Sequence, residues 1–240
     1  MSTFDEIRRI TNVMAKDICE STGVKISLVI NVIQYARRLC RPTNPDFIEE
    51  LVFIAQMGQR FGITSTFHVK LMFDAIRVKD TKQLKVEDFA RLICVFYSKK
   101  LDVKIDFVFS VYDFYHDHHI SPQEMTALLK TAIVSAGDDD AIEQLKELIE
   151  MVLLVFDMDG DGVISLEEFR HLVHKNILYI QLLGQVLPHK EVIDAFMDNL
   201  KNKTPLAVRN QYTHERTDCL NEPRAKDTKD DLYPVILELP

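Results

Sequence analysis

Residues 157–168 restrict the fold more than any other segment, because carboxylates recur in it at a fixed spacing. Asp157, Asp159 and Asp161 stand at positions 1, 3 and 5 of this segment, and Glu168 stands at position 12. Four carboxylates in so short a stretch repel one another unless a cation neutralises them, so bound metal stabilises the folded loop. A hard cation such as Ca²⁺ takes about six to eight oxygen ligands. The segment therefore predicts a loop that binds a divalent cation.

The remaining positions complete a twelve-residue EF-hand loop. Gly162 stands at position 6, where the chain turns sharply with a positive φ. An apolar-striped helix is expected over residues 141–156, and Ser165 with Glu168 forms a capping box that begins the next helix. The predicted ligands are Asp157, Asp159, Asp161, the Val163 backbone carbonyl, Ser165 directly or through water, and both oxygens of Glu168. The expected ion is Ca²⁺. Mg²⁺ is an alternative occupant at rest, although its octahedral preference suits the loop less well.

EF-hands occur in pairs that meet at position 8 of each loop, so a partner loop is expected upstream. Residues 113–124 keep the frame, with oxygen-bearing side chains at four ligand positions: Asp113, Asp117, Ser121 and Glu124. Tyr115 replaces the position-3 ligand, and His118 stands at the bend, where it must adopt a left-handed backbone. We therefore predict a structural loop that binds no metal and pairs through Ile120 with Ile164. Weak Ca²⁺ binding is the alternative.

Two further helix–loop–helix units are expected. Residues 77–88 repeat the frame with Leu84 at position 8, but Arg77, Lys79 and Lys82 stand at or beside the place of the ion. The loops begin at residues 77, 113 and 157, which are 36 and 44 residues apart and so form an internal repeat. A fourth unit is expected within residues 20–60. Neither unit is expected to bind metal, because cationic side chains stand at the ion's place in 77–88 and no acidic set is present in the loop of the fourth unit.

The predicted fold class is all-α, with paired helix–loop–helix units of the EF-hand superfamily joined by short antiparallel pairing between their loops. Apolar residues recur at steps of three and four, and only 7 Gly and 8 Pro argue against a many-stranded fold. We expect an N-terminal helical lobe with degenerate EF-hands over 1–98. A C-terminal EF-hand lobe with a helix after its last hand is expected over 99–200, and an extended polar tail over 201–240.

Composition excludes several other classes of function. The net charge of −8 gives no basic surface for nucleic acid. No apolar run approaches the ~20 residues of a membrane span, and Ser at position 2 excludes N-myristoylation, so no membrane anchor is expected. The four cysteines are far apart, which is typical of reduced thiols. No nucleophile elbow, P-loop or dinucleotide motif is present, so the protein is not expected to be an enzyme. The histidine groups 116–119 and 171–174 are expected to be solvated rather than zinc ligands.

Three stretches carry a family resemblance: the two hands at 107–125 and 157–169, and residues 174–188 after the last hand, which end in Leu-Pro. On these residues the chain resembles the calaxin-like EF-hand proteins of ciliary outer dynein arms. They belong to the broader group of neuronal calcium sensors and calcineurin B-like proteins. The resemblance covers about residues 5–195 and implies a helix ending at the Leu-Pro. It also implies an axonemal calcium sensor, in the cytoskeleton of a cilium or flagellum, that is bound to the outer-arm docking complex and dynein.

Two functions remain open at this point. In the first, Ca²⁺ opens a hydrophobic groove that takes a helix of a helical or coiled-coil partner. In the second, the protein is a constitutive structural component of an axonemal assembly, and the metal only stabilises it. The alternative family assignment is a soluble calcineurin B-like or neuronal-calcium-sensor-type regulator, found in the cytoplasm, that binds an amphipathic helix of its target.

A set of aliphatic, Met and Phe side chains is expected to line the groove or, in the simpler interpretation, only the core. These are Phe107, Val108, Leu128, Leu129, Ile133, Leu148, Met151, Val152, Val155, Phe169 and Leu172. The acidic run 137–150 favours basic residues beside a bound helix. Either residues 178–187 or the apolar end of the tail, 232–239, is expected to fill the groove in the absence of a partner.

Overall fold

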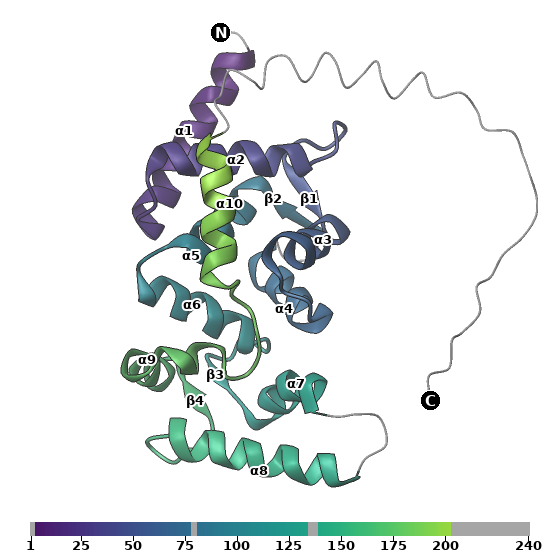
Figure 1. Ribbon diagram of the computed structural model, residues 1–240, viewed down its shortest axis with the longest axis vertical. Coiled ribbons are helices and arrows are strands. Elements are labelled where there is room, and N and C mark those ends of the chain that lie inside the picture. The colour runs from purple at the N-terminus through teal and green to yellow at the C-terminus, as the bar shows by residue number, and fades with distance from the viewer. Residues whose placement is uncertain (1–2, 78–80, 134–138, 203–240) are drawn as a thin grey trace, which may run out of the picture. The chain divides into compact units, whose positions relative to one another are not determined.

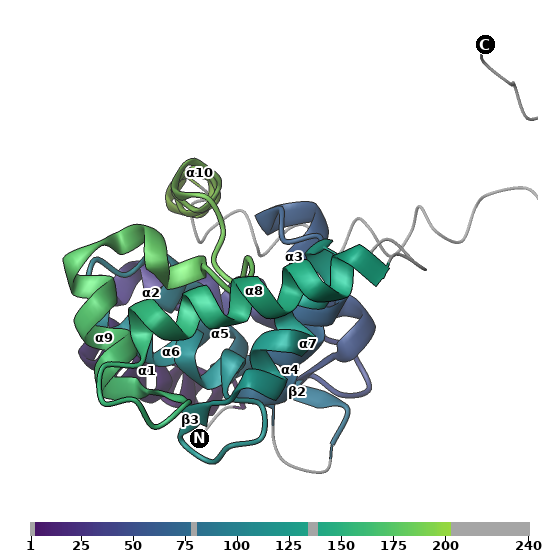
Figure 2. The same ribbon diagram turned by 90° about the horizontal axis from the view of Figure 1, so that it is seen from below.

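The structure is a computed structural model that describes residues 3–77, 81–133 and 139–202, with side chains for 5–77, 81–130 and 142–202. The first half contains α1 (Thr3–Thr22), α2 (Ile26–Leu39), β1 (Phe47–Glu49), α3 (Glu50–Phe61), α4 (Thr66–Ile76), β2 (Gln83–Lys85) and α5 (Val86–Tyr97). The second contains α6 (Leu101–Tyr112), β3 (His119–Ile120), α7 (Pro122–Ile133), α8 (Asp139–Phe156), β4 (Ile164–Ser165), α9 (Leu166–Lys175), the 3₁₀ helix η1 (Ile177–Gln181) and α10 (Lys190–Asn202). Figures 1 and 2 show the arrangement of these elements.

The predicted all-α fold of paired hands is confirmed. Each pair is joined by a two-stranded antiparallel sheet between its loops, β1 with β2 and β3 with β4. Ile120 lies opposite Ile164, as the position-8 argument predicts, and both side chains are buried. The cores of the two halves are continuous, since the rings of Phe96 on α5 and Phe107 on α6 pack 6.0 Å apart. The described residues from 3 to 202 belong to one compact unit.

The fourth unit consists of α2, β1 and α3 and lies in the expected range 20–60 except for its last residue, Phe61. Ile48 pairs with Leu84 across β1 and β2, and both are fully buried. The equivalent loop therefore begins at Arg41, thirty-six residues before Arg77, the same interval that separates Arg77 from Asp113. Arg41 occupies position 1 and pairs with Glu49 at 2.8 Å, so a cationic side chain stands where a metal-binding loop has its first carboxylate.

The prediction of a helix that spans residues 178–187 and ends at the Leu-Pro is wrong. The chain forms only the short η1 helix and then turns, because the Gln181 side-chain oxygen accepts hydrogen bonds from the backbone N–H groups of Val186 and Leu187 at 3.0 and 2.8 Å. Within this turn Gly184 has a φ of 137°, a conformation that no helix contains. The long helix after the last hand is α10 instead, which begins beyond Pro188.

Helix α10 packs across α2, α3 and α5 (Figure 1). Ile193, Met197 and Leu200 are buried, and the Phe196 ring lies 5.0 Å from those of both Tyr35 and Phe61. These four α10 residues follow the i, i+3, i+4, i+7 spacing of an amphipathic helix. The tail end 232–239, which was expected as another occupant of a groove, lies outside the described residues. So does the rest of the predicted tail beyond Asn202, where α10 ends.

The turn between η1 and α10 is fixed to the helical core by two side chains. Tyr112 on α6 donates its hydroxyl to the Gly184 carbonyl at 2.6 Å. His68 on α4 is buried, with Nε2 at 3.2 Å from the Leu183 carbonyl and Nδ1 at 2.7 Å from the Ser65 hydroxyl. Burial lowers the pKa of His68, although the Leu183 carbonyl opposes this shift. The ring is therefore neutral at pH 7, with Nε2–H donating to Leu183 and Nδ1 accepting from Ser65.

Candidate metal centre

The loop 157–168 connects α8 to α9 and brings its three aspartates together. One carboxylate oxygen from each of Asp157, Asp159 and Asp161 lies within 4.8 Å of the others. The loop is compact because the Asp157 carboxylate accepts the backbone N–H groups of Gly160 at 2.6 Å, Asp161 at 3.2 Å and Gly162 at 2.9 Å. The chain's own amides thus hold the carboxylates in one cluster of oxygen ligands.

Two glycines allow this turn. Gly162 has a φ of 87°, which confirms the predicted left-handed bend at position 6. Gly160 at position 4 also has a positive φ, of 81°. Sequence reasoning gave no role to Gly160, although a second glycine so close to the first is itself a signal of a tight turn.

Glu168 closes the loop from the first turn of α9. It is 6% exposed, and its Oε1 accepts the Met158 N–H at 2.7 Å. Its Oε2 accepts the Ser165 N–H at 2.8 Å, and the Ser165 hydroxyl accepts the Glu168 N–H at 3.3 Å, so the predicted capping box is present. Burial alone raises the pKa of Glu168, but the hydrogen bonds from Ser165, Met158 and Asp159 outweigh it and lower that pKa. The carboxylate is therefore ionised at neutral pH.

The donor set fits a hard divalent cation, because every predicted ligand offers oxygen. Asp157, Asp159 and Asp161 converge, whereas Glu168 is not part of that cluster and accepts the Met158 N–H instead. The Ser165 hydroxyl donates to Glu168 at 2.7 Å, which commits it to the capping box. Of the two options for position 9, contact through water is therefore favoured over direct contact.

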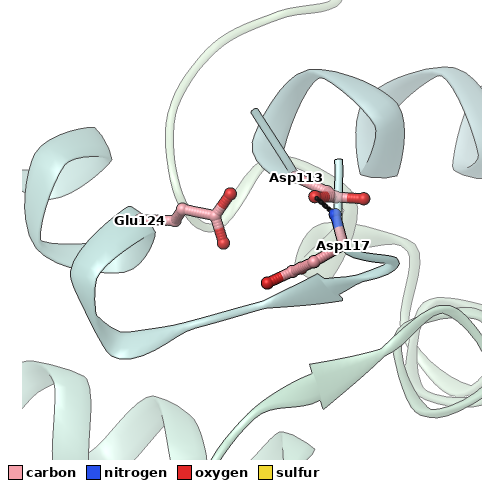
Figure 3. Close-up of side chains that lie close together, drawn as sticks. All are labelled: Asp113, Asp117 and Glu124. Atoms are coloured by element: carbon pink, nitrogen blue, oxygen red, sulfur yellow. Dashed lines mark hydrogen bonds between the residues drawn. The ribbon is translucent and has the colours of Figure 1, made fainter. Parts of the chain in front are cut away.

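Loop 113–124 has the same scaffold (Figure 3). Asp113, Asp117 and Glu124 each place one carboxylate oxygen within 4.8 Å of the others. Asp113 accepts the N–H groups of Asp117 and His118 at 3.1 and 3.0 Å, and the buried Glu124 accepts the Tyr115 N–H at 2.9 Å. Backbone amides thus satisfy the carboxylates in both loops.

The two loops differ at positions 3, 4 and 6. His116 and His118 have φ values of 60° and 70°, where loop 157–168 has glycines. The φ of His118 confirms the left-handed backbone predicted there. This conformation costs roughly 1–2 kcal/mol for a residue with a Cβ atom. Tyr115 is 64% exposed and supplies no carboxylate at position 3. That loop 113–124 is structural stays a prediction.

Restoring both positions is expected to create a second Ca²⁺ site. Tyr115→Asp adds the missing carboxylate, and His118→Gly removes the backbone cost at the bend. Calorimetric stoichiometry should rise from one Ca²⁺ to two in the double variant. His118→Gly alone is the control: it should raise the melting temperature and leave the stoichiometry at one. A wild-type protein that already binds two ions with similar affinity would contradict the prediction.

Most of the residues proposed for the groove wall are core residues. The buried members are Phe107, Val108, Leu128, Leu129, Val152, Phe169 and Leu172. Leu148 is half-buried, and only Met151 and Val155 are exposed among the members whose side chains the structure describes. The side chain of Ile133 lies outside the described residues. The described members of this set therefore form no open groove between the two hands.

Comparison with known proteins identifies an EF-hand pair in the second half of the chain. The family model for an EF-hand domain pair matches residues 102–174, which contain both loops of the second pair. The chain is 28% identical to a calaxin of Xenopus laevis over 65% of this chain and 77% of the relative. It is 29% identical to a calaxin of Danio rerio over 57% and 65% of the two chains.

A second group of relatives covers a shorter region. The human calcineurin B protein of type 2 is 37% identical over 32% of this chain and 46% of its own length. Coverage is also incomplete among the calaxins, since the chain spans 61% of those from Bos taurus and Homo sapiens. No helix among the described residues is long and apolar enough to cross a membrane.

Proposed function

We propose that this chain, a calaxin-like EF-hand protein, is a calcium sensor that holds a helix of an axonemal partner. The observation that carries the proposal is the direct path from the metal loop to α10. Glu168 lies in the first turn of α9, α9 leads through η1 to the turn at Gly184, and α10 follows. A shift of α9 would reach the helix that covers α2, α3 and α5 through this turn, which Tyr112 and His68 hold on α6 and α4.

The metal step uses the ligands already described. Bound Ca²⁺ supplies the positive charge that relieves repulsion among Asp157, Asp159, Asp161 and Glu168. Glu168, in the first turn of α9, would hold the cation in place of some of its present donors, the N–H groups of Met158, Asp159 and Ser165.

Helix α9 contacts α6 through the buried ring of Phe169, which packs 5.9 Å from Phe109 and 6.2 Å from Tyr112. At the surface, Arg170 pairs with Asp106 at 2.6 Å and the His174 side chain contacts Asp102 at 2.8 Å. Exposed pairs contribute at most about 1 kcal/mol, so a movement of α9 depends mainly on rearranging the buried contacts of Phe169.

The partner site is the surface beneath α10. A groove that accepts the apolar face of α10 has the shape and chemistry to accept another amphipathic helix. Such a partner presents apolar side chains at the spacing of Ile193, Phe196, Met197 and Leu200. The likeness to calaxins supports placing the protein in the axoneme of a cilium or flagellum, with the outer dynein arm docking complex and dynein as partners. The role is regulatory, without catalysis.

Loosening α10 tests this proposal. Phe196→Ala with Met197→Ala removes two of its anchors, so the groove is open more often and the apparent affinity for a partner helix rises. Binding of reconstituted outer-arm docking complex should become about tenfold tighter without Ca²⁺ and lose most of its Ca²⁺ dependence. The matched control is Asp198→Ala with Asn199→Ala, on the exposed face of the same helix. Equal affinity in wild type and the loosened variant would refute the groove mechanism.

The calcineurin B relatives favour a second candidate, a soluble regulator that uses the same groove for the helix of another target. Identity to those relatives reaches 37–38%, although over a shorter region than the calaxin match. Localisation separates the two candidates. Retention in detergent-extracted axonemes supports the axonemal role, and complete release into the soluble fraction supports the second.

A further inference from the structure

The outer face of α8 carries an apolar patch that no other described element covers. Its members are Met151, Leu154, Val155 and Met158, which are 56%, 85%, 45% and 55% exposed. They recur at i, i+3, i+4 and i+7, so they form one stripe along the second half of the helix and into the metal loop. Side chains of this size are normally turned inward, and a contiguous exposed set marks an interaction site.

The patch is distinct from the core face of α8. Leu145, Ile149, Val152 and Phe156 are buried against the rest of the unit and follow their own i, i+4, i+7, i+11 stripe. In Figure 2, α8 crosses in front of the neighbouring helices, and in Figure 1 it lies at the lower edge of the compact unit. Helix α8 therefore presents two apolar stripes, of which the fold uses one.

Acidic side chains flank the patch on the preceding turns. Glu143, Glu147 and Glu150 are exposed. Glu143 lies 3.4 Å from Lys146, whereas no cation among the described residues pairs with Glu147 or Glu150. At 100° per residue, these glutamates project from the same side of the helix as Leu154. The surface is thus apolar toward the metal loop and negative toward the beginning of α8.

We propose that this face of α8 is a second protein-docking surface, which takes an amphipathic helix with basic residues beside its apolar stripe. The occupant follows from charge complementarity. A second copy of the chain would oppose glutamates with glutamates, and an anionic membrane would be repelled. Two methionines suit the surface to a helix of variable sequence, since their side chains adapt their shape. The surface lies apart from the groove under α10, and the inference does not rest on the proposed calcium-sensor function.

Two synthetic peptides test the proposal on the full-length protein in saturating Ca²⁺. Both carry leucines at i, i+3, i+4 and i+7; one has lysines at the flanking positions, and the other has glutamates. With methyl-labelled methionine and leucine, the lysine peptide should shift the NMR signals of Met151, Leu154 and Met158. Its affinity should exceed that of the glutamate peptide by about tenfold and should fall with added salt.

Matched variants separate the apolar and the charged contributions. Leu154→Asn should lower the affinity for the lysine peptide by about tenfold, because a Leu side chain is no longer buried on binding. Ile142→Asn, which is also exposed but lies outside the patch at the beginning of α8, should leave the affinity within about twofold. Glu147→Gln with Glu150→Gln should weaken binding several-fold, whereas Glu20→Gln with Glu191→Gln should not.

Four results overturn the proposal. They are equal affinity for the glutamate peptide, peptide-induced shifts only around α2, α3 and α5, self-association of the protein that Leu154→Asn abolishes, and adsorption to phosphatidylserine vesicles that Leu154→Asn abolishes. The second result would leave the groove mechanism intact. Failure of the α10 test would leave this surface intact.

Discussion

Glu168→Gln is expected to weaken Ca²⁺ binding by about a hundredfold, since ligand charge moves the affinity of such loops over several decades. The substitution removes one negative charge and the second ionised oxygen at position 12. The glutamine carbonyl can still accept the Met158 N–H, so the hydrogen bond that joins the first turn of α9 to the loop is kept. Calorimetry at fixed ionic strength measures the loss.

Glu167→Gln is the matched control, because it removes the same charge from the neighbouring position, which lies outside the predicted ligand set. Its effect should stay within about twofold at physiological salt, where charges near the surface are screened. An unchanged isotherm for Glu168→Gln, or two comparable sites in the wild-type protein, would show that loop 157–168 is not the principal site.

Gly184→Ala is expected to destabilise the protein by about 3 kcal/mol, through overpacking and backbone strain together. A Cβ atom at this position would lie 2.0 Å from His68 Nε2, and the backbone has a φ of 137° that a residue with a side chain rarely adopts. The His68 ring cannot turn away without losing its hydrogen bond to the Leu183 carbonyl or to the Ser65 hydroxyl. Thermal unfolding should show a melting temperature several degrees lower.

Gly58→Ala is the control, because Gly58 lies inside α3 and its nearest neighbour to a new Cβ atom is the Ile63 carbonyl at 4.0 Å. It should be neutral or stabilise the protein by up to about 1 kcal/mol. Adding His68→Ala to Gly184→Ala tests the mechanism, since removing the ring should recover part of the loss. If Gly184→Ala has the same melting temperature as the wild type, the turn is not held as tightly as its contacts indicate.

Much of the site was predictable because metal ligation imposes a spacing on the sequence. The approach of the three aspartates in 157–168, the left-handed backbone at His118 and the pairing of Ile120 with Ile164 all follow from that frame. The fourth unit was located only to within residues 20–60. Its loop, beginning at Arg41, has no acidic signature, and its position becomes clear only when Ile48 is seen opposite Leu84.

The region after the last hand was predicted less well, for a different reason. The turn at Gly184 depends on His68 and Tyr112, which lie far away in the sequence, so no local pattern contains it. Helix α10 was not predicted, although the apolar spacing from Ile193 to Leu200 is that of an amphipathic helix. Its docking on α2, α3 and α5 could not be predicted from that spacing, because periodicity defines an apolar face and does not identify the surface that the face contacts.

The position of α10 in the chain has a consequence for biosynthesis. The apolar surface of α2, α3 and α5 is complete once Tyr97 has been made, but the helix that covers it begins at Lys190. At about 5–20 residues per second, a nascent chain exposes that surface for roughly 5–20 s. The ribosome-bound protein is therefore a substrate for chaperones during this interval, and the same surface is available to a partner helix before α10 exists to compete for it.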